Sequence, residues 1–588
     1  MGKFTEPVLP DFDLDEWARR PYFERLQAMC VDWSLRGFGI PPVAYLFYVV
    51  KLIFYVGGFI VVASFTPGIG GVTDFGDWWF EPIVFQKAVI WTLLWEVLGL
   101  GCGSGPLTGR MNPPFTAVAF FLKRGTVRLR PFSWVPGTAG DSRTVVDVVL
   151  YAALLALGVR ALFVGEIDGD VILPFVIVGL LAGLRDKTVF LAARAEHYLL
   201  TTAVFLWPAD GLAGAKAVQL ALWMGAATSK LNHHFPSVIT AMLSNHPLNF
   251  SDRFRRALYR DHPRDMRSSK LAAVIAHGAT VVEYTAPLVL AFSVGGWPTT
   301  LALVVMVSFH LTILSSFPLG VPLEWNIFFV FSALSLFGHH SEVRFWEIDS
   351  PLLIAVLVVC CLVVPVLGNQ WPAKASFLPS MRYYAGNWAA SVWIFKPGVY
   401  QRVHGSLVTP IPSYLDQVDT FVGAELAPVT MARGQAFRSM HLQGRALNAL
   451  IARLLEPVAV IGNDPDNCDR FDGGGRVGDG RGVAELDPIG DEGLTVLDGE
   501  LVAATALGWN FGEGHLHHEQ LLAAIAARCE LAEGDLRCAF LESEPMFGPL
   551  HWRIADAATG RIAEGHVEAA DLVEQQPWST STPLATSS

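Results

Sequence analysis

Long apolar runs alternate with short polar connections between residues 44 and 368 and do not continue beyond them. A helix that crosses a bilayer needs about 20 mostly apolar residues. The pattern predicts ten such helices, of which the fourth and the ninth are short. Their ranges are 44–64, 83–101, 145–164, 171–184, 188–207, 215–235, 270–292, 299–317, 325–338 and 351–368. We therefore expect an all-α polytopic membrane domain over 44–370, preceded by an N-terminal cytosolic segment over 1–43.

The pattern changes after residue 371. The stretch FLPSMRYYAGNWAASVWIFKPG is aromatic and carries a few cations, which is typical of a segment at a membrane interface. ARGQAFRSMHLQGRALNALIARLL then shows a helical period, so 371–461 is predicted to be an interfacial and helical segment. Residues 462–493 are rich in glycine and aspartate, which predicts a flexible linker.

A small α+β domain is predicted over 494–578. LTVLDGELVAATALGW alternates as strands do, EQLLAAIAARC has the period of a helix, and HWRIADAATGRIAEGHV predicts a hairpin that turns at AATG. The Ser/Thr-rich tail 579–588 is predicted to be disordered. The expected fold class is an all-α membrane domain of about ten helices followed by a cytosolic α+β domain.

Loop charge predicts the orientation, because Lys and Arg remain on the cytoplasmic side of a membrane. The N-terminal segment and the loops 102–144 and 236–270 are rich in arginine, whereas the loop 65–82 has neither Lys nor Arg. This alternation places both termini in the cytoplasm. Only 16% of the residues are charged, and the formal net charge of −12 argues against nucleic acid as a partner.

Ionisable side chains concentrate in the second half of the predicted membrane domain, where each is costly and therefore a functional candidate. A lysine removed from water can act as a base near neutral pH, and a neighbouring histidine can relay the proton. Each residue alone also has a structural interpretation, as a snorkelling cation or as half of an ion pair. The candidate catalytic residues are Lys230, His197, His277, Glu283 and His310.

Five short motifs give the stretch 184–338 a family resemblance. In order, they are LRDKTVF, AEHYLL, MGAATSKLNHHF, AHGATVVE and SFHLTI. With them the stretch resembles the vitamin K-dependent γ-glutamyl carboxylase and the wider horizontally-transferred-transmembrane-domain (HTTM) superfamily. The resemblance implies that Lys230 matches the base of that family and His197 a histidine that its chemistry needs, while His277, Glu283 and His310 fall at similar places.

The resemblance also implies a quinol, such as menaquinol, as the cofactor or substrate. Two departures limit it, because the chain lacks the lumenal, disulfide-bearing portion of the carboxylase and its charge pattern puts Lys230 toward the cytoplasm. We therefore expect a lipid-embedded base rather than carboxylation of protein glutamates. The whole chain, through PGTAGDSRTVVDV and SMHLQGRALNAL, also resembles an actinobacterial multi-pass family with no assigned function, which implies a bacterial inner (plasma) membrane.

The tail holds one further group of candidate ligands, in GEGHLHHEQ. His515, His517 and His518 follow a glycine-rich turn, and two alternating histidines can reach one transition metal. The alternative is that they are solvated loop histidines. Since no second cluster supplies the remaining ligands, no metal site is predicted.

Together these observations predict a membrane-embedded acid/base enzyme that acts on a quinol or another lipid, with Lys230 as the base and His197 as its partner. The alternative is a non-enzymatic protein, either a lipid or small-molecule transporter or a membrane scaffold. The expected partners are a membrane lipid or quinone and a protein bound by the C-terminal domain, and not nucleic acid.

Overall fold

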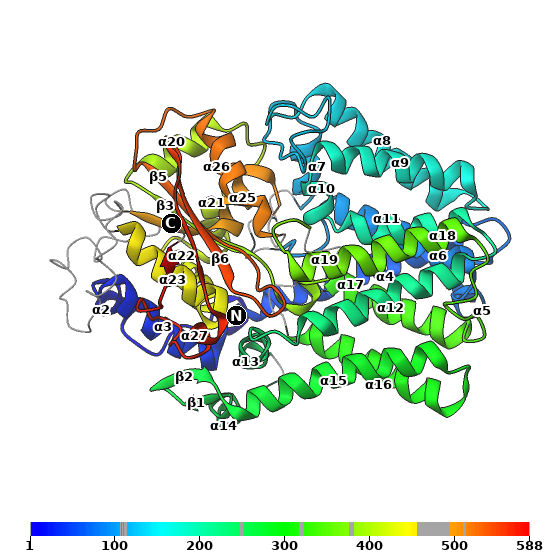
Figure 1. The fold of residues 1–588 in the computed structure, drawn as a ribbon, viewed down its shortest axis with the longest axis horizontal. Helices are drawn as coiled ribbons and strands as arrows, with labels where there is room; N and C mark the ends of the chain where they lie inside the picture. The colour runs from blue at the N-terminus through cyan, green and yellow to red at the C-terminus, as the bar shows by residue number, and fades with distance from the viewer. Residues whose placement is uncertain are drawn as a thin grey trace.

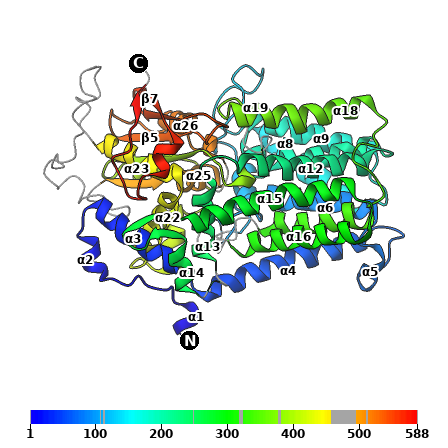
Figure 2. The same cartoon turned by 60° about the horizontal axis from the view of Figure 1, so that its bottom comes forward.

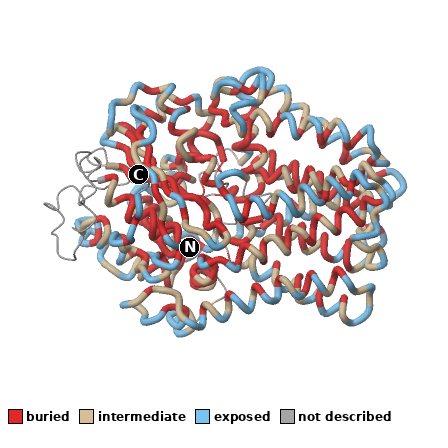
Figure 3. The backbone as a smooth tube through the Cα atoms, viewed as in Figure 1, coloured by how far each residue is buried: buried red, intermediate tan, exposed pale blue. Residues whose placement is uncertain are grey.

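The protein has two parts, a helical bundle and an α/β domain that packs against one end of the bundle (Figure 1). The bundle helices run roughly parallel to one another, and both termini lie at the α/β end (Figure 2). Interior bundle helices and the central sheet are buried, while the outer surface is exposed (Figure 3). This computed structural model describes residues 2–105, 108, 110, 114–246, 249, 251–316, 323–375, 381–455, 494–509 and 513–586.

Within the described chain, five helices are long and apolar enough to cross a membrane. Their outward faces carry exposed apolar side chains such as Ile53, Val149 and Val281, which in a bilayer contact lipid tails. The five are α4 (Pro42–Ser64), α8 (Val145–Phe163), α15 (Lys270–Phe292), α16 (Gly296–Ser315) and the stretch Pro351–Gln370, which comprises α18 (Pro351–Val358), η5 (Val359–Val363) and α19 (Val364–Gln370).

The other predicted spans also correspond to helices, but they do not meet that criterion. The prediction of about ten membrane-spanning helices is therefore not confirmed. Interior helices such as α6 and α12 bury most of their surface, so they tolerate polar and small residues that a lipid-facing helix excludes. These elements are α6 (Pro82–Val97), α9 (Gly169–Arg185), α10 (Thr188–Leu191), α11 (Ala195–Ala203), α12 (Gly211–Ser229) and α17 (Leu323–Ser332).

The fifth predicted span, 188–207, is broken between α10 and α11 at Arg194. The backbone of Arg194 is left-handed, with φ of 54°. Its buried guanidinium donates to the Ala192 carbonyl at 2.8 Å, to Cys102 Sγ at 2.7 Å and to the Tyr383 hydroxyl at 2.8 Å. The break therefore places a buried arginine, held by these three hydrogen bonds, inside the bundle.

The α/β domain is built on a six-stranded antiparallel sheet with the order β4-β3-β5-β6-β7-β8. Helices cover both faces: α22 and α23 pack on one, and α25 and α26 on the other. The strands are β3 (Ala390–Phe395), β4 (Thr495–Asp498), β5 (Leu536–Leu541), β6 (Leu550–Asp556), β7 (Gly560–Val567) and β8 (Ala585–Thr586). The helices are α22 (Ala427–Met440), α23 (Leu442–Leu455), α25 (Gly499–Leu507) and α26 (Glu519–Ala526).

Strand β3 lies inside the segment that the sequence predicts to be interfacial. All six of its residues are buried: Val392 and Ile394 face the α23 side, and Trp393 and Phe395 face the α25 side. A strand covered on both faces shows no apolar–polar alternation, so its sequence does not reveal it. The interfacial segment and the tail are thus one domain, and helix α3 (Tyr22–Arg36) of the N-terminal segment packs on α22.

The structure of the tail agrees with the prediction at the hairpin and differs from it in two other places. The hairpin at AATG is confirmed as β6 and β7, with Asp556 opposite Gly560. The second half of LTVLDGELVAATALGW is the helix α25 rather than a strand, because Asp498 caps it by accepting from Glu500 N. The predicted disordered tail contains β8, which pairs with β7. The predicted linker 462–493 lies outside the described residues.

Glu544, in the loop after β5, makes a dense group of contacts between the domain and the bundle. Its carboxylate accepts from the backbone N and ring Nδ1 of His233 at 2.8 and 2.9 Å, and from the same two atoms of His234 at 2.9 Å each. The backbone carbonyl of Glu544 accepts from the side-chain amide of Asn232 at 3.1 Å and from that of Asn387 at 2.7 Å. Helix α13 (Phe235–Asn245) begins directly after His234, so the carboxylate also faces a helix N-terminus.

Replacing Glu544 should weaken this contact. Burial alone would raise the pKa of Glu544, but hydrogen bonds from His233 and His234 lower it to about 2. Since an unfolded glutamate has a pKa of about 4.3, the stabilisation is complete above that pH and is lost as the pH falls toward 2. We expect Glu544→Gln to cost about 2 kcal/mol at pH 7. Thermal unfolding of wild type and Glu544→Gln from pH 7 to pH 3 measures this difference in stability.

The control is Glu530→Gln, which changes an exposed carboxylate of the same domain. The melting temperatures of wild type and Glu544→Gln should converge as the pH falls, while the control follows wild type throughout. A constant difference between wild type and Glu544→Gln across that range would contradict the assignment.

Candidate functional site

A cavity of about 250 Å³ lies where the bundle meets the α/β domain, and we call it the junction cavity. Its bundle wall comes from α12, α13, α15, α16 and α17. Its domain wall comes from residues 383–390, α21 (Tyr414–Val422), α22, α23, β4, α25 and the loop before α26. One water needs only roughly 15 Å³ of such space, so the junction cavity has room for an organic molecule. Most of the side chains in both walls are apolar or aromatic.

A buried ion pair lies in the bundle wall. Lys230, at the C-terminal end of α12, donates to Glu283 Oε2 in the middle of α15, and each side chain is 4% exposed. The ammonium also lies 5.4 Å from the ring centre of Phe235 and 5.3 Å from that of Phe309. Aromatic faces attract a cation, so all three neighbours favour a charged Lys230. The hydrogen-bond partner of Lys230 in the structure is thus Glu283, whereas the sequence analysis expects His197 as its partner.

Lys230 uses only part of its hydrogen-bonding capacity. An ammonium has three N–H donors. In Lys51, another buried lysine, the ammonium has three acceptors. They are Glu324 Oε1 at 2.7 Å and the backbone carbonyls of Gly101 and Ser104 at 2.9 and 3.3 Å. Within the described chain, Glu283 is the hydrogen-bond acceptor found for Lys230. Lys230 thus has donors that a ligand in the junction cavity can engage.

His310 stands in the same wall, but both of its ring nitrogens are occupied. Trp223 Nε1 donates to Nε2 of His310 at 3.1 Å, and Nδ1 lies 2.8 Å from Asn326 Oδ1. Because the indole can only donate, Nε2 is the acceptor, and the neutral ring carries its proton on Nδ1. His310 is therefore held in one tautomer as an ordered part of the wall.

The remaining two predicted residues lie elsewhere. His197 is buried, and both of its ring nitrogens lack a hydrogen-bond partner among the described residues. It lies behind Phe329, whose ring centre is 5.8 Å from that of His197 and 5.5 Å from that of His310. His277 is on the exposed face of α15. The structure thus brings Lys230, Glu283 and His310 into one wall but not the two others.

The domain wall contains polar residues that sequence analysis missed. They come from α22, the turn before α23, α23, β4 and α25, which the sequence places in an interfacial segment and in strands. One signal was present, because two of them belong to the motif SMHLQGRALNAL. These residues are Arg438, His441, Gln443, Asp498 and Glu500, and His517, a candidate metal ligand in the sequence, lies in the same wall.

The three tail histidines point to different partners. His515 lies between Glu513, at 3.1 Å, and Glu542, at 2.8 Å. His517 Nδ1 is 2.7 Å from Ser391 Oγ, and His518 Nε2 is 3.3 Å from Lys187 Nζ. In the described ranges, no group of three or more His, Cys, Asp or Glu could hold a metal ion. All three histidines make specific contacts inside the protein, which a loop of freely solvated histidines would not show.

The comparisons with known proteins identify the family of the chain. It belongs to a family of transmembrane proteins of unknown function (DUF3556), whose model matches residues 1–461 and 479–587. No curated protein and no solved structure matches the chain. Membership supports a membrane protein, in agreement with the five apolar helices. It does not bear on the resemblance to the carboxylase superfamily or on an actinobacterial origin, which stay predictions.

Replacing one member of the Lys230–Glu283 pair should destabilise the protein more than replacing both members. Lys230→Met leaves a buried, unpaired carboxylate, which costs about 3 kcal/mol. Lys230→Met/Glu283→Gln leaves two neutral side chains of similar shape, so it should recover most of that loss. The melting temperatures of the two variants in one membrane mimetic measure the difference. A double variant no more stable than the single one would show that the two residues do not act as a pair.

His515 should stabilise the domain in a pH-dependent way. Burial alone would lower the pKa of His515, but the carboxylates of Glu542 and Glu513 raise it to about 9. Its contribution is therefore complete below the unfolded pKa of about 6.5 and is lost as the pH rises through 9. We expect His515→Gln to lower the melting temperature by roughly 5 °C at pH 6.5 and by much less at pH 9.5. The exposed His551→Gln is the control.

Proposed function

We propose that this membrane protein holds a lipid-soluble molecule with a polar head, such as a quinol, in the junction cavity and exchanges a proton with it through Lys230 and Glu283. The observation that carries the proposal is a buried ion pair in the wall of a largely apolar cavity. An apolar cavity at the end of membrane helices favours a ligand that reaches it from the bilayer. An ion pair in its wall supplies both a proton acceptor and a proton donor.

The chemistry follows from the partners of each group. The Glu283 carboxylate can accept the proton of a ligand hydroxyl, while the Lys230 ammonium stabilises the oxyanion that forms. No new net charge is buried, because the proton only moves between groups inside the junction cavity. The proposal therefore moves the base from Lys230 to Glu283 and gives Lys230 the role of the cation. His197, behind Phe329, has no part in this step.

The test follows the reaction of reduced menaquinone with oxygen. Wild type in phosphatidylcholine nanodiscs is incubated with the quinol in air, and mass spectrometry measures quinone and quinone epoxide above the background of empty nanodiscs. We expect Lys230→Met/Glu283→Gln to lower the rate by about 100-fold or more, the usual contribution of positioned acid–base groups.

The matched control is Lys51→Met/Glu324→Gln. It removes a second buried ion pair, with an N–O distance of 2.7 Å, that is not part of either cavity wall. This variant should react as wild type does. Equal rates for all three proteins and the empty nanodiscs would refute the proposed chemistry. Quinol that is retained but not converted would favour the alternative of a lipid carrier or transporter.

A further inference from the structure

We infer that Arg253, Arg256 and Lys270 form a surface that binds the headgroups of anionic phospholipids beside the start of α15. We call these three side chains the basic surface, and the end of the bundle that meets the α/β domain the junction end. The inference goes beyond the proposed function, because the three residues do not belong to the lining of the junction cavity. Its support is the position of the basic surface in the bilayer, the charge around it and the way it is held.

The basic surface lies at the level where a bilayer has its headgroups. Helix α15 has 23 residues and is therefore about 34 Å long, slightly more than the roughly 30 Å of hydrocarbon that it crosses. Its first residue, Lys270, is exposed, and so are the apolar side chains of Leu271 and Val274. The lipid-facing surface thus begins within about one turn of Lys270, which places the ammonium beside the lipid phosphates.

Helix α14 (Asp252–Ala257) lies directly against the start of α15. Ser269, which caps α15, donates from its hydroxyl to the Ala257 carbonyl at 2.7 Å. Arg253 and Arg256 are three residues apart, so they share one side of α14, and both are exposed. Since α14 is about 9 Å long, within the Debye length of about 10 Å at 0.1 M salt, its arginines act with Lys270 on the same headgroups.

The charge of this segment is opposite to that of the chain. Residues 252–270 include seven Lys or Arg and three Asp, although the formal net charge of the chain is −12. Asp252 pairs with Arg255 at 3.6 Å, and Asp261 and Arg264 are exposed next to the hairpin turn. Within the described part of the chain, no ion pair involves a side chain of the basic surface. The basic surface therefore has charge available for an external anion.

The other arginines of the segment hold it in place. A two-stranded hairpin connects α14 to α15. Glu574 of the α/β domain lies 2.9 Å from Arg260 and 2.7 Å from Arg267, and Arg255 donates to the Leu35 carbonyl of α3. The support of the basic surface is thus ordered before a lipid binds, which reduces the entropic cost of binding. The strands of the hairpin are β1 (Tyr259–Asp261) and β2 (Asp265–Ser268).

The opposite end of the bundle is acidic. Helix α5 (Phe75–Trp78) marks that end in Figures 1 and 2. The loops there contain nine Asp or Glu residues and one Arg. Anionic headgroups would meet like charges at that end and opposite charges at the basic surface, so the junction end is the one that suits an anionic leaflet. These loops are 65–81, 164–168, 207–210, 293–295 and 340–350.

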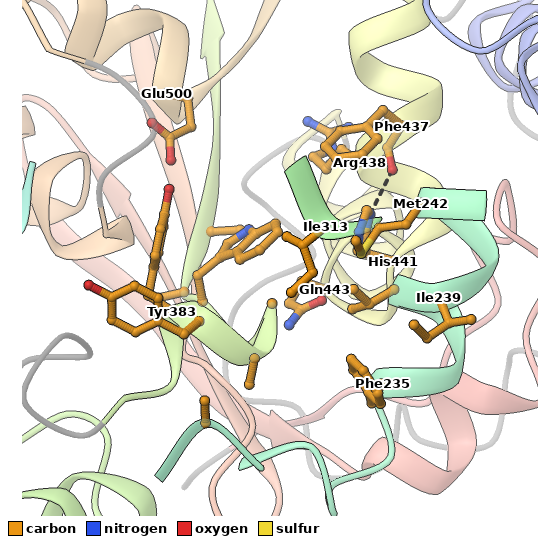
Figure 4. A pocket seen from close by; sticks show the side chains of 18 of the residues that line it. Phe235, Ile239, Met242, Ile313, Tyr383, Phe437, Arg438, His441, Gln443 and Glu500 are labelled. Carbon is orange, nitrogen blue, oxygen red and sulfur yellow. Dashed lines mark hydrogen bonds between the residues drawn. The ribbon is translucent and has the colours of Figure 1, made fainter. Parts of the chain in front are cut away.

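Helix α13 separates the basic surface from the junction cavity. Phe235, Ile239 and Met242 line the cavity (Figure 4). Thr240, on another side of α13, donates to Ser268 Oγ of the hairpin at 3.0 Å. One helix therefore contributes to the wall of the cavity and to the support of the basic surface. A lipid on the basic surface contacts the outside of the protein and leaves the cavity to its own ligand.

The side chains of the basic surface suit a phosphate that carries net charge. A guanidinium donates two parallel hydrogen bonds to phosphate oxygens, and an ammonium adds a point charge. Each Lys or Arg near an anionic membrane surface contributes about a fivefold preference. Phosphatidylcholine balances its phosphate with a choline cation, whereas phosphatidylglycerol does not. The expected occupant is therefore a phospholipid of the second kind.

The test compares wild type with Arg253→Gln/Arg256→Gln/Lys270→Gln. Each protein is reconstituted in nanodiscs with equal amounts of phosphatidylglycerol and phosphatidylcholine that have the same acyl chains. Native mass spectrometry of the released protein measures the ratio of the two lipids that it retains. We expect wild type to retain at least about tenfold more phosphatidylglycerol, and the triple variant to lower that ratio at least about fivefold.

The control removes the same number of exposed cations far from α15. It is Arg19→Gln/Lys396→Gln/Arg402→Gln, in the N-terminal segment and the α/β domain. Arg19 follows α2 (Leu14–Ala18), and Arg402 lies in α20 (Val399–Ser406); Figure 1 shows both helices well away from α15. The control should retain the lipids in the wild-type ratio. Melting temperatures in phosphatidylcholine nanodiscs show that both variants are folded.

Two results would overturn the inference. Wild type that retains the two lipids equally overturns it with no variant needed, and would favour an acidic protein segment as the occupant. A folded triple variant that keeps the wild-type ratio also overturns it.

A further measurement distinguishes a lipid headgroup from a soluble anion. Phosphatidylglycerol in the nanodisc should raise the melting temperature of wild type, whereas inorganic phosphate added to phosphatidylcholine nanodiscs at the same concentration should not. An equal rise with inorganic phosphate would assign the basic surface to a soluble anion and overturn the inference. The reaction of menaquinol is measured in phosphatidylcholine alone, so the proposed function and this inference can fail separately.

Discussion

A charge removed from water must find a partner, and this constraint determines how the two parts of the protein join. The bundle follows α12 with Lys230, Asn232, His233 and His234, and each of the last three donates a hydrogen bond to Glu544 of the α/β domain. Among the described residues, the Glu544 carboxylate is held by the backbone and ring N–H groups of His233 and His234. Bundle and domain therefore complete each other's hydrogen bonding at this turn.

The junction cavity follows from this joint. Lys230 is four residues before His234, so the ion pair in the cavity wall and the contact between bundle and domain share one short turn. The short polar contacts fix the distance between the two parts, and bulky aromatic side chains such as Trp223, Trp325 and Trp388 surround the space between them. The result is a cavity lined by residues of both parts, which neither part would form alone.

The sequence predicts the apolar helices and the importance of Lys230, since both depend on local pattern. It does not predict the partner, because Glu283 is 53 residues away from Lys230. The position of His277 could have been predicted: six residues at about 100° each place it roughly 240° around the helix from Glu283, away from the ion pair. The domain wall could not have been predicted from the sequence. Strand β3 is buried on both faces, and its neighbours β4 and β5 lie more than 90 residues later in the chain.

Stability alone does not account for the Lys230–Glu283 pair. A buried ion pair is often no more stabilising than apolar residues of the same size, because both charges lose their hydration. Lys51 offsets that loss with a carboxylate and two carbonyls, whereas within the described chain Lys230 has Glu283 as its hydrogen-bond acceptor. A charge held with donors unused beside a cavity is costly while the cavity lacks a polar ligand. The same donors become favourable when an oxygen of the ligand accepts from them, so the energetics of the pair favour an occupied site.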